Sequence, residues 1–530
     1  MKRKYRILSI IISAALMAGC LTACGENGTT PGGSTTDENT ATTVTGGETT
    51  VTTPELPADV EAPDMTDATA ISLSGETATV TGSGAEVTDG VVTITAGGTY
   101  VVTGTMTEGR IIVNAPKEEV TLVLQNTSVT CSTGSPLYVY KSKTTAIYLP
   151  EGTASTLTDG TGYTFNDSYS SAEEDEPNAC LYAKSDLIIA GTGSLTVKAN
   201  YNNGITGKDT LLIEKATVTV TAANHGINGK DSLTVKNAAV TVTGGGDALR
   251  STNDSDSTLG YIVIADSTLN LTAGEDGIQA ETTLTISGGS INITRSYEGL
   301  EGAAVNITGG NISLVANDDG INAAGGSDQS GFGGFFMDRF GGSGEYFINI
   351  SGGIINIDAS GDGIDSNGDI NISGGELYIS GPTSNGDGAI DCDGNATITG
   401  GIVAAAGSNG MAENFGNAST QGSMLVNLSG SAGQTITLKD ANGNVLVSYT
   451  PAKSYGCVVI SAPGIVQGGT YTVTAGSGST TVTMTSLIYG GMGGMGGMGG
   501  QQPPQGGGNM GGQQPPQGSG NMGGRPDGRG

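Results

Sequence analysis

Glycine-centred motifs recur at nearly constant intervals through the middle of this sequence. One motif is Ser/Thr-Gly-Gly, with apolar residues two and four positions before its first glycine and after its second. Ten or eleven residues earlier stands a second motif, usually an acid followed by glycine and isoleucine or leucine. Its copies lie 21 or 22 residues apart except at three longer intervals. They are Asn203-Gly204-Ile205, His225-Gly226-Ile227, Asp247-Ala248-Leu249, Asp276-Gly277-Ile278, Glu298-Gly299-Leu300, Asp319-Gly320-Ile321, Asp362-Gly363-Ile364 and Gly388-Ala389-Ile390.

This period constrains the fold class strongly. The segments between the glycines alternate Val, Ile or Thr with polar residues, which is the pattern of β-strands. Short strands repeating every 22 residues or so predict a parallel β-helix, in which stacked coils bury the apolar faces that one coil cannot bury alone. The Gly-Gly pairs suit corners with positive φ. Leucine-rich repeats and calcium-binding nonapeptide repeats lack the required spacing here, and an array of β-sandwiches remains the structural alternative.

The composition divides the chain into segments. Residues 24–68 are rich in Thr, Gly, Pro and acids, which predicts a flexible linker, and residues 490–530 repeat Gly, Met, Gln and Pro, which predicts a disordered tail. An insertion at 325–346 holds four phenylalanines, and its role stays open. The predicted order is a lipoprotein signal peptide (1–23), the linker (24–68), N-terminal β coils or a cap (69–180), the β-helix repeat region (181–420), a small C-terminal β module (421–489) and the tail.

The N-terminus resembles a bacterial lipoprotein leader. Basic residues precede an apolar run from Ile7 to Met17, which is too short for a membrane span, and Leu21-Thr22-Ala23-Cys24 resembles a lipobox. We therefore expect lipidation of Cys24 and a protein that is anchored outside the cytoplasm at the cell surface; Cys20 and a plain secretory leader are the alternatives. The four later cysteines show no CxxC spacing, although Cys131 and Cys180 could pair.

The charge balance excludes two classes of partner. The net charge is −30, and loss of the four basic residues of the leader lowers it to about −34. Nucleic acids are bound through Lys and Arg, so a nucleic-acid partner is not expected. The same charge disfavours an anionic membrane surface, which leaves the lipid as the expected membrane contact.

The acids are concentrated and in register. Between Glu275 and Asp393 there are 18 acids and two basic residues, Arg295 and Arg339. Stacking of equivalent positions places carboxylates roughly 5 Å apart, which is unfavourable without protons or cations. Calcium takes six to eight oxygen ligands and suits such a column, whereas the alternative is that the acids only cap turns. The candidate ligands are Asp276, Glu298, Glu301, Asp318, Asp319, Asp362, Asp365 and Asp391.

Longer stretches resemble a known family. Lys184-Ser185-Asp186-Leu187-Ile188-Ile189, Asp318-Asp319-Gly320-Ile321-Asn322-Ala323 and Gly361-Asp362-Gly363-Ile364-Asp365-Ser366-Asn367-Gly368 are similar to the surface carbohydrate-binding β-helix family of plant-cell-wall-degrading anaerobic bacteria, over about residues 70–490. The resemblance implies a right-handed parallel β-helix shaped like pectate lyases. It also implies bound calcium, affinity for polygalacturonate, with cellulose as a further ligand, and binding rather than catalysis.

Three functions follow as hypotheses. The first is a monomeric lipoprotein that binds acidic cell-wall polysaccharide through calcium, since a divalent cation reverses the local sign of an acidic surface. The second is a polysaccharide lyase, which needs a base near the calcium-bound sugar; Arg295 is the basic residue of the regular acidic coils. The third is a structural adhesin without glycan specificity. Fold class alone does not decide among them.

Overall fold

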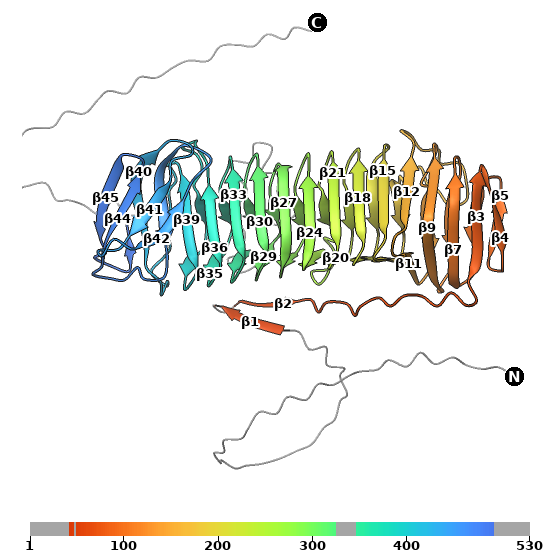
Figure 1. Ribbon diagram of the computed structural model, residues 1–530, viewed down its shortest axis with the longest axis horizontal. Helices are drawn as coiled ribbons and strands as arrows, with labels where there is room; N and C mark the ends of the chain where they lie inside the picture. Colours follow the sequence, from red (N-terminus) through yellow and green to blue (C-terminus); the bar gives the residue numbers. More distant parts are fainter. Residues whose placement is uncertain (1–41, 47–48, 325–345, 492–530) are drawn as a thin grey trace, which may run out of the picture.

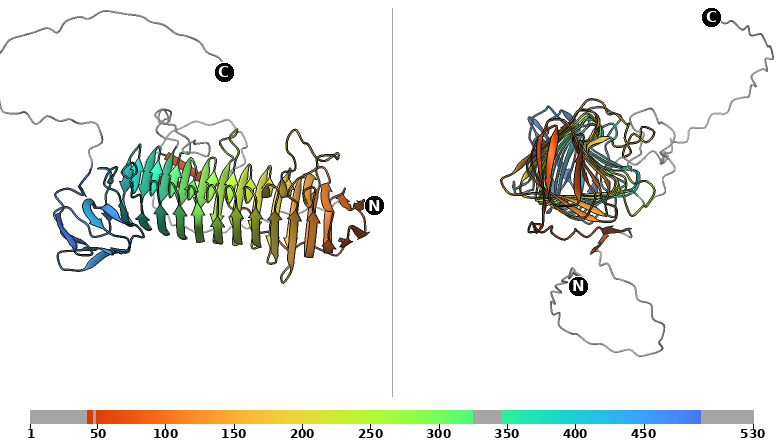
Figure 2. Two further views of the ribbon diagram at one scale, coloured as in Figure 1. Left: turned by 90° about the horizontal axis from the view of Figure 1, so that it is seen from above. Right: turned by 90° about the vertical axis from the view of Figure 1, so that its right-hand side faces the viewer.

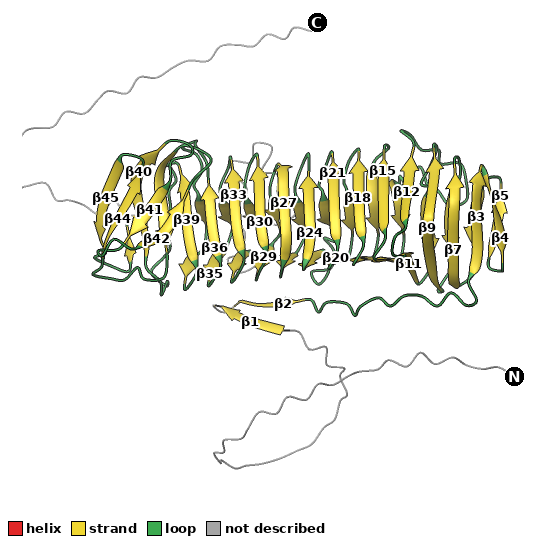
Figure 3. Ribbon diagram, viewed as in Figure 1, coloured by secondary structure: helices red, strands yellow, loops and turns green. Residues whose placement is uncertain are grey.

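The computed structural model describes residues 42–46, 49–324 and 346–491, with side chains from Pro54 onward. The leader with Cys24, nearly all of the phenylalanine-rich insertion and residues 492–530 of the tail lie outside the described residues. The described residues form an all-β rod with a compact module at one end (Figures 1 and 3). Within the described part of the chain, no helix is long and apolar enough to cross a bilayer.

The rod is a parallel β-helix, which confirms the fold class expected from the repeat. Each coil contributes one short strand to sheet 1 and one strand each to sheets 2 and 3, and each strand pairs in parallel with its equivalent in the next coil (Figure 2). Ile278, Leu300, Ile321, Ile364 and Ile390 follow one another in register along sheet 1 and are 0–1% exposed. Burial of such apolar stacks is the main stabilising contribution.

The strands of sheet 1 are mostly three to five residues long, in the spatial order β37 to β5. Their bounds are β5 (Ala85–Thr88), β6 (Val91–Ile94), β8 (Arg110–Asn114), β10 (Leu137–Lys141), β13 (Ala179–Ala183), β16 (Asn203–Gly207), β19 (Ile227–Gly229), β22 (Leu249–Ser251), β25 (Ile278–Ala280), β28 (Leu300–Glu301), β31 (Ile321–Ala323), β34 (Ile364–Ser366) and β37 (Ile390–Cys392).

Sheets 2 and 3 merge at the N-terminal end, where β3 (Thr69–Gly75), β7 (Gly98–Met106) and β9 (Glu119–Cys131) are continuous and β4 (Thr77–Thr81) pairs antiparallel with β3. Sheet 2 comprises β11 (Thr144–Leu149), β14 (Asp186–Gly191), β17 (Thr210–Glu214), β20 (Ser232–Lys236), β23 (Tyr261–Ala265), β26 (Thr283–Ile286), β29 (Ala304–Ile307), β32 (Phe347–Ile350), β35 (Asp369–Ile372) and β38 (Ala396–Ile398). Sheet 3 comprises β12 (Ala154–Asp159), β15 (Ser194–Ala199), β18 (Thr217–Ala222), β21 (Ala239–Gly244), β24 (Ser267–Thr272), β27 (Gly289–Ser296), β30 (Asn311–Ala316), β33 (Ile354–Ala359), β36 (Glu376–Ser380) and β39 (Ile402–Gly407).

The C-terminal module covers the last coil. Strand β43 (Tyr455–Ser461) pairs antiparallel with β39 and with β40 (Ser423–Gly430), and β40 pairs with β46 (Ile488–Tyr489). A separate antiparallel sheet holds β41 (Ile436–Lys439), β42 (Val445–Tyr449), β44 (Thr470–Ala475) and β45 (Gly478–Thr483). Antiparallel pairing with β39 satisfies an edge that would otherwise be open to association with another chain.

The Gly-Gly pairs turn the chain from sheet 2 to sheet 3. The second glycine of every pair has a positive φ of 79–99°, which is costly for residues with a Cβ atom. In earlier coils the positive φ falls one position earlier in the corner, at Lys215, Asn237 and Asp266, with values of 46–60° that larger residues can still adopt. The motif is therefore a backbone requirement of the corner.

The glycine of the second motif has a different cause, which is close packing. A Cβ on Gly204 would lie 2.3 Å from Val220 Cγ1 and 2.4 Å from the carbonyl oxygen of Gly226. We expect Gly204→Ala to lower the free energy of unfolding by about 1–3 kcal/mol, as in other overpacked cores. The cost stays moderate because Ala248 and Ala389 occupy the equivalent position in other coils. Urea denaturation measures the change, and Gly162→Ala, where no atom lies within 4 Å of the added Cβ, should leave stability unchanged.

Residues 54–62, which we call the strap, run along the outside of sheet 2 towards β3 (Figure 1). The hairpin of β1 (Thr42–Gly46) and β2 (Thr49–Thr53) precedes it. Asp59 lies 2.7 Å from Lys215 Nζ and 3.0 Å from Lys236 Nζ, and the amide of Val60 donates to Glu214 Oε2 at 2.9 Å. The pKa of Asp59 falls to about 2 because both lysines donate hydrogen bonds to it. The composition of the linker predicts none of these contacts.

The strap covers a buried ion pair, and removing half of that pair should be costly. The side chains of Glu214 and Lys236 are 0% and 4% exposed, with 3.6 Å between their charged atoms. We expect Lys236→Met to lower the free energy of unfolding by up to about 3 kcal/mol, because Glu214 would stay buried without one of its partners. This is the low end of the cost of breaking a buried ion pair, since Lys215 remains 3.0 Å from Glu214. Differential scanning calorimetry measures the loss. Lys236→Met combined with Glu214→Leu should regain most of it, and an equally unstable double variant would contradict this account.

Candidate functional site

Polar side chains line sheet 1 in two columns that run along the rod. The before-glycine column holds the residue before the glycine of the second motif, or before Ala248 in one coil, and contains Asp247, Asp276, Glu298, Asp319 and Asp362. The after-isoleucine column follows the stacked Ile or Leu, and the strand register pairs Gln279 with Glu301, Glu301 with Asn322, Asn322 with Asp365, and Asp365 with Asp391. Equivalent positions in the repeat therefore share one face, as the sequence predicts.

Three predicted ligands converge where the two columns meet at strands β31 and β34. Carboxylate oxygens of Asp319, Asp362 and Asp365 all lie within 4.8 Å of one another. Asp319 and Asp362 come from the turns that lead into the two strands, and Asp365 lies within β34. We call these residues the carboxylate trio. A cation with bonds of about 2.3–2.6 Å to oxygen fits between oxygens at such separations.

The before-glycine carboxylates also have a structural role. Asp319 Oδ1 accepts a hydrogen bond from the amide of Asp362 at 2.5 Å, and Asp362 Oδ1 accepts one from the amide of Gly388 at 2.5 Å. Asp276 Oδ1 likewise accepts from the amide of Glu298 at 3.0 Å. Each acid thus caps the turn of the next coil, as the turn-capping hypothesis predicts. A carboxylate has a second oxygen, so capping and metal ligation are compatible.

Electrostatics make the trio unfavourable in its fully ionised form. Burial and the charge of Asp319 raise the pKa of Asp362 to about 9, although the Gly388 amide opposes the shift. Burial, Asp319 and Asp391 raise the pKa of Asp365 well above its usual value. Among the described residues, the main causes of both shifts include no Lys or Arg. The site is therefore relieved either by protons or by a bound cation.

The other predicted ligands lie along the same face but outside the trio. Asp276 has a pKa raised to about 7 by burial and by Asp247. Glu298 and Glu301 are 2% and 3% exposed, and Glu298 Oε2 accepts from Asn322 Nδ2 at 3.1 Å. The hydroxyl of Tyr297 bonds to Asp318, which raises the pKa of the tyrosine.

Asp391 begins an acidic extension at the C-terminal end of the column. Its pKa is raised by burial, with Asp393 and Asp387 adding to the shift. Glu413, from the segment after β39, has a pKa raised to about 7 by burial and by Asp391 and Asp393. Sequence reasoning missed Glu413, because it lies outside the repeat and its position offers no periodic signal.

A second cluster on this face was also missed. His225, Asp247 and Glu275 bring ligand atoms within 4.8 Å of one another, but Arg250 Nη1 lies 2.7 Å from His225 Nε2 and 3.1 Å from Asp247 Oδ2. Burial alone would raise the pKa of Asp247; His225 and Arg250 reverse the shift and lower it. The guanidinium thus supplies the positive charge that the trio lacks. His225 and Asp247 belong to copies of the repeat, so extending the column upstream would have found them.

The basic residue considered for lyase chemistry makes a different contact. Arg295 Nε donates to the carbonyl oxygen of Ala273 at 3.1 Å, where β27 bulges against β24. The four cysteines of the described residues, Cys131, Cys180, Cys392 and Cys457, are free thiols, so the suggested pairing of Cys131 with Cys180 is wrong.

Part of the chain is similar to known carbohydrate-binding proteins. Residues 88–336 match a family described as carbohydrate-binding domain-containing proteins. A protein of that description from Acetivibrio thermocellus is 37% identical over 212 residues, which amount to 40% of this chain and 73% of the relative. A solved structure of a polysaccharide lyase-like protein from C. thermocellum, a gadolinium derivative, is 24% identical and has a TM-score of 0.37, over 63% of this chain and 97% of the other.

Proposed function

The chain belongs to the family of carbohydrate-binding domain-containing proteins, and we propose that it binds acidic plant cell-wall polysaccharide, such as polygalacturonate, through calcium held by the carboxylate trio. The observation that carries the proposal is the convergence of Asp319, Asp362 and Asp365 with pKa values raised at Asp362 and Asp365. Oxygen donors without a cysteine or histidine favour a hard cation such as calcium over zinc or copper.

Calcium would also supply the attraction that the protein itself lacks. A chain with a net charge of −30 repels a polyuronate. Three carboxylates leave several of the six to eight calcium positions open, and uronate oxygens from the polymer would complete them. The trio is partly exposed, which gives a polymer access to the bound ion. Methyl-esterified galacturonate lacks the charged oxygen and should coordinate poorly.

A retention assay tests this proposal. We expect the protein to be retained on insoluble polygalacturonate in calcium, and to be released by EGTA because the bridging ion is removed. Highly esterified pectin should retain much less protein. Sedimentation followed by quantification of the bound fraction gives the measurement. Retention that is unchanged by EGTA and by esterification would refute calcium bridging. Absence of binding to every sugar of a glycan array would favour the adhesin hypothesis.

The lyase alternative requires a base beside the calcium-bound sugar. Arg250, which lies in β22 of sheet 1, precedes β31 by three strands, roughly 14 Å at the usual strand spacing. Arg295 bonds to a backbone carbonyl. This placement favours binding over cleavage. Incubation with polygalacturonate and calcium should give no rise in the absorbance of unsaturated products, and a sustained rise would establish a lyase.

Lipidation of Cys24 and display at the cell surface complete the proposal. The lipobox-like sequence motivates both, and a lipid would attach the protein to the membrane without a spanning helix. Cys24→Ala should abolish metabolic labelling with palmitate; unchanged labelling would shift the assignment to Cys20.

A further inference from the structure

The N-terminal end of the rod holds a pocket that is distinct from the trio. Its volume is about 540 Å³, within the usual range for sites that bind small molecules. Arg110 begins β8, which lies eight strands from β31 in sheet 1, roughly 40 Å along the rod. Turns at Glu76, Asp89 and Glu108 form part of the wall, and the loop at residues 164–167 closes the other part.

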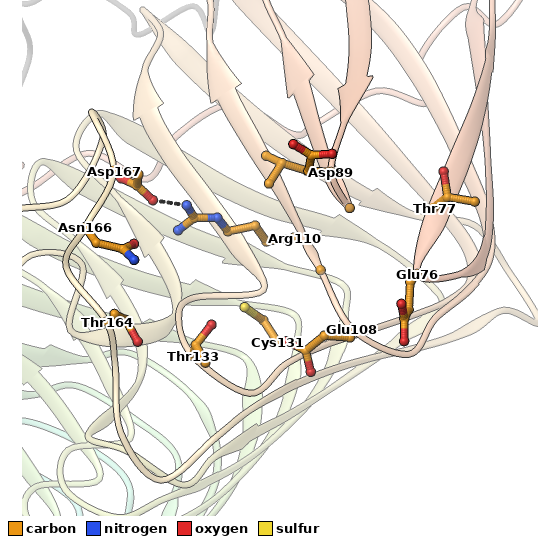
Figure 4. A pocket seen from close by; sticks show the side chains of 13 residues that line it. Glu76, Thr77, Asp89, Glu108, Arg110, Cys131, Thr133, Thr164, Asn166 and Asp167 are labelled. Carbon is orange, nitrogen blue, oxygen red and sulfur yellow. Dashed lines mark hydrogen bonds and ion pairs between the residues drawn. The ribbon is translucent and has the colours of Figure 1, made fainter.

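The two walls of the pocket differ in hydrogen-bonding character. Figure 4 shows Arg110 and Asn166 on one side and Glu76 and Thr77 on the opposite side, with Glu108 nearer the latter. The guanidinium of Arg110 only donates hydrogen bonds and the carboxylates of Glu76 and Glu108 only accept them, whereas the Asn166 amide and the Thr77 hydroxyl can do both. A molecule with groups that both donate and accept can therefore form hydrogen bonds to both walls.

Arg110 is held in a fixed position rather than left mobile in solvent. Its side chain is 15% exposed, and one of its amino groups forms an ion pair with Asp167 Oδ2. Asp167 Oδ1 accepts from the amides of Tyr169 and Ser170 at 2.8 and 2.9 Å, so the same carboxylate also holds the loop. The planar guanidinium keeps further donors in a rigid fork, which suits recognition of a ligand with fixed geometry.

Charge limits the class of ligand. Asp167 balances Arg110, which leaves Glu76, Asp89 and Glu108 as the net charge of the lining. An anionic sugar or phosphate would be repelled. A metal ion is also disfavoured, because among the described residues the acids that converge closely enough to hold one are elsewhere. An uncharged, hydroxyl-rich ligand meets both walls, since each hydroxyl can donate and accept.

We propose that this pocket is a second carbohydrate site, which binds uncharged sugar residues without calcium. It goes beyond the proposed uronate site, because it needs neither the trio nor an acidic polymer. The lining contains no aromatic residue, so hydrogen bonds to the sugar hydroxyls must supply the recognition. Charge-assisted bonds to carboxylates and to Arg110 are the strongest of these.

The test measures binding of cellotetraose, xylotetraose and galactotetraose to the full chain by calorimetry in EGTA. We expect at least one of them to bind. Thr133→Trp fills the pocket from an exposed position and should weaken that binding at least tenfold; Asn166→Ala, a smaller change in the lining, should weaken it in the same direction. Thr217→Trp, at an exposed position on sheet 3, is the matched control and should leave the affinity unchanged.

Two results would overturn the proposal. One is that none of the three tetrasaccharides binds the unaltered chain, and the other is that Thr133→Trp and Asn166→Ala both leave affinity unchanged. Retention on polygalacturonate in calcium is measured in parallel for every variant. Thr133→Trp should keep that retention, so the failure of one site is distinguishable from the failure of the other.

Discussion

Replacing Asp362 and Asp365 by asparagine is expected to weaken calcium binding at least a hundredfold and to abolish calcium-dependent retention on polygalacturonate. The double variant leaves one carboxylate of the trio and removes both groups whose pKa values are raised. Asparagine preserves side-chain size and keeps one oxygen that can accept the hydrogen bond from the Gly388 amide. The loss should therefore reflect ligation more than folding, and calorimetric titration with calcium measures it.

The matched control removes two charges elsewhere. Glu118 and Glu151 are exposed acids of the N-terminal coils, and Glu118→Gln with Glu151→Gln makes the same change in net charge. This control should bind calcium and polygalacturonate as the unaltered chain does. Equal losses in both double variants would show that overall charge, rather than the trio, controls retention. Unchanged calcium affinity in the Asp362/Asp365 variant would exclude the trio as the site.

In EGTA, the stability of the protein is expected to fall steeply as the pH rises from about 4 to about 9. The pKa of Asp362 is about 9 in the folded protein, against an ordinary value of 3.8. The folded state therefore binds more protons than the unfolded state between these values, and stability is lost as the pH rises through the folded pKa. Five pKa units correspond to about 7 kcal/mol, and we expect about half of that because water and neighbouring groups screen the charge.

Saturating calcium should flatten or reverse this dependence. The ion binds the deprotonated carboxylates, so calcium affinity rises with pH and binding releases protons. Calcium at a hundred times its dissociation constant contributes about 2.7 kcal/mol. Urea denaturation at a series of pH values, with calcium and with EGTA, gives the comparison. Asp276 and Glu413 also have raised pKa values, each near 7, so they too make stability fall as the pH rises. The difference between the unaltered chain and the Asp362→Asn/Asp365→Asn variant therefore isolates the contribution of the trio. Identical pH profiles for this variant and the unaltered chain in EGTA would contradict the assignment.

The sequence by itself determined the coil and its axial order. A period of 22 residues requires each coil to repeat the same backbone path, so Ile278 and Leu300 must stack and Glu301 must follow Gln279 in the same column. Glycines are required at the corners because the backbone there adopts a positive φ, and at Gly204 because neighbouring atoms leave no room for a Cβ. Both requirements arise from the local backbone and its neighbouring coil. Register therefore placed all eight predicted ligands on or beside one face without any knowledge of the tertiary structure.

Only the tertiary structure decided which acids form a site. Strand register gives the position of each acid along the rod, but the distance between the two columns depends on how each turn enters its strand. In this fold, the turns before β31 and β34 bring Asp362 and Asp365 close to Asp319 and leave Asp391 outside the trio. The same limit applies to contacts between segments that do not repeat. Arg110 pairs with Asp167 across 57 residues, and Asp59 reaches Lys236 across 177, through loops whose lengths follow no period. Such contacts are selected by packing and charge in three dimensions, and no sequence interval encodes them.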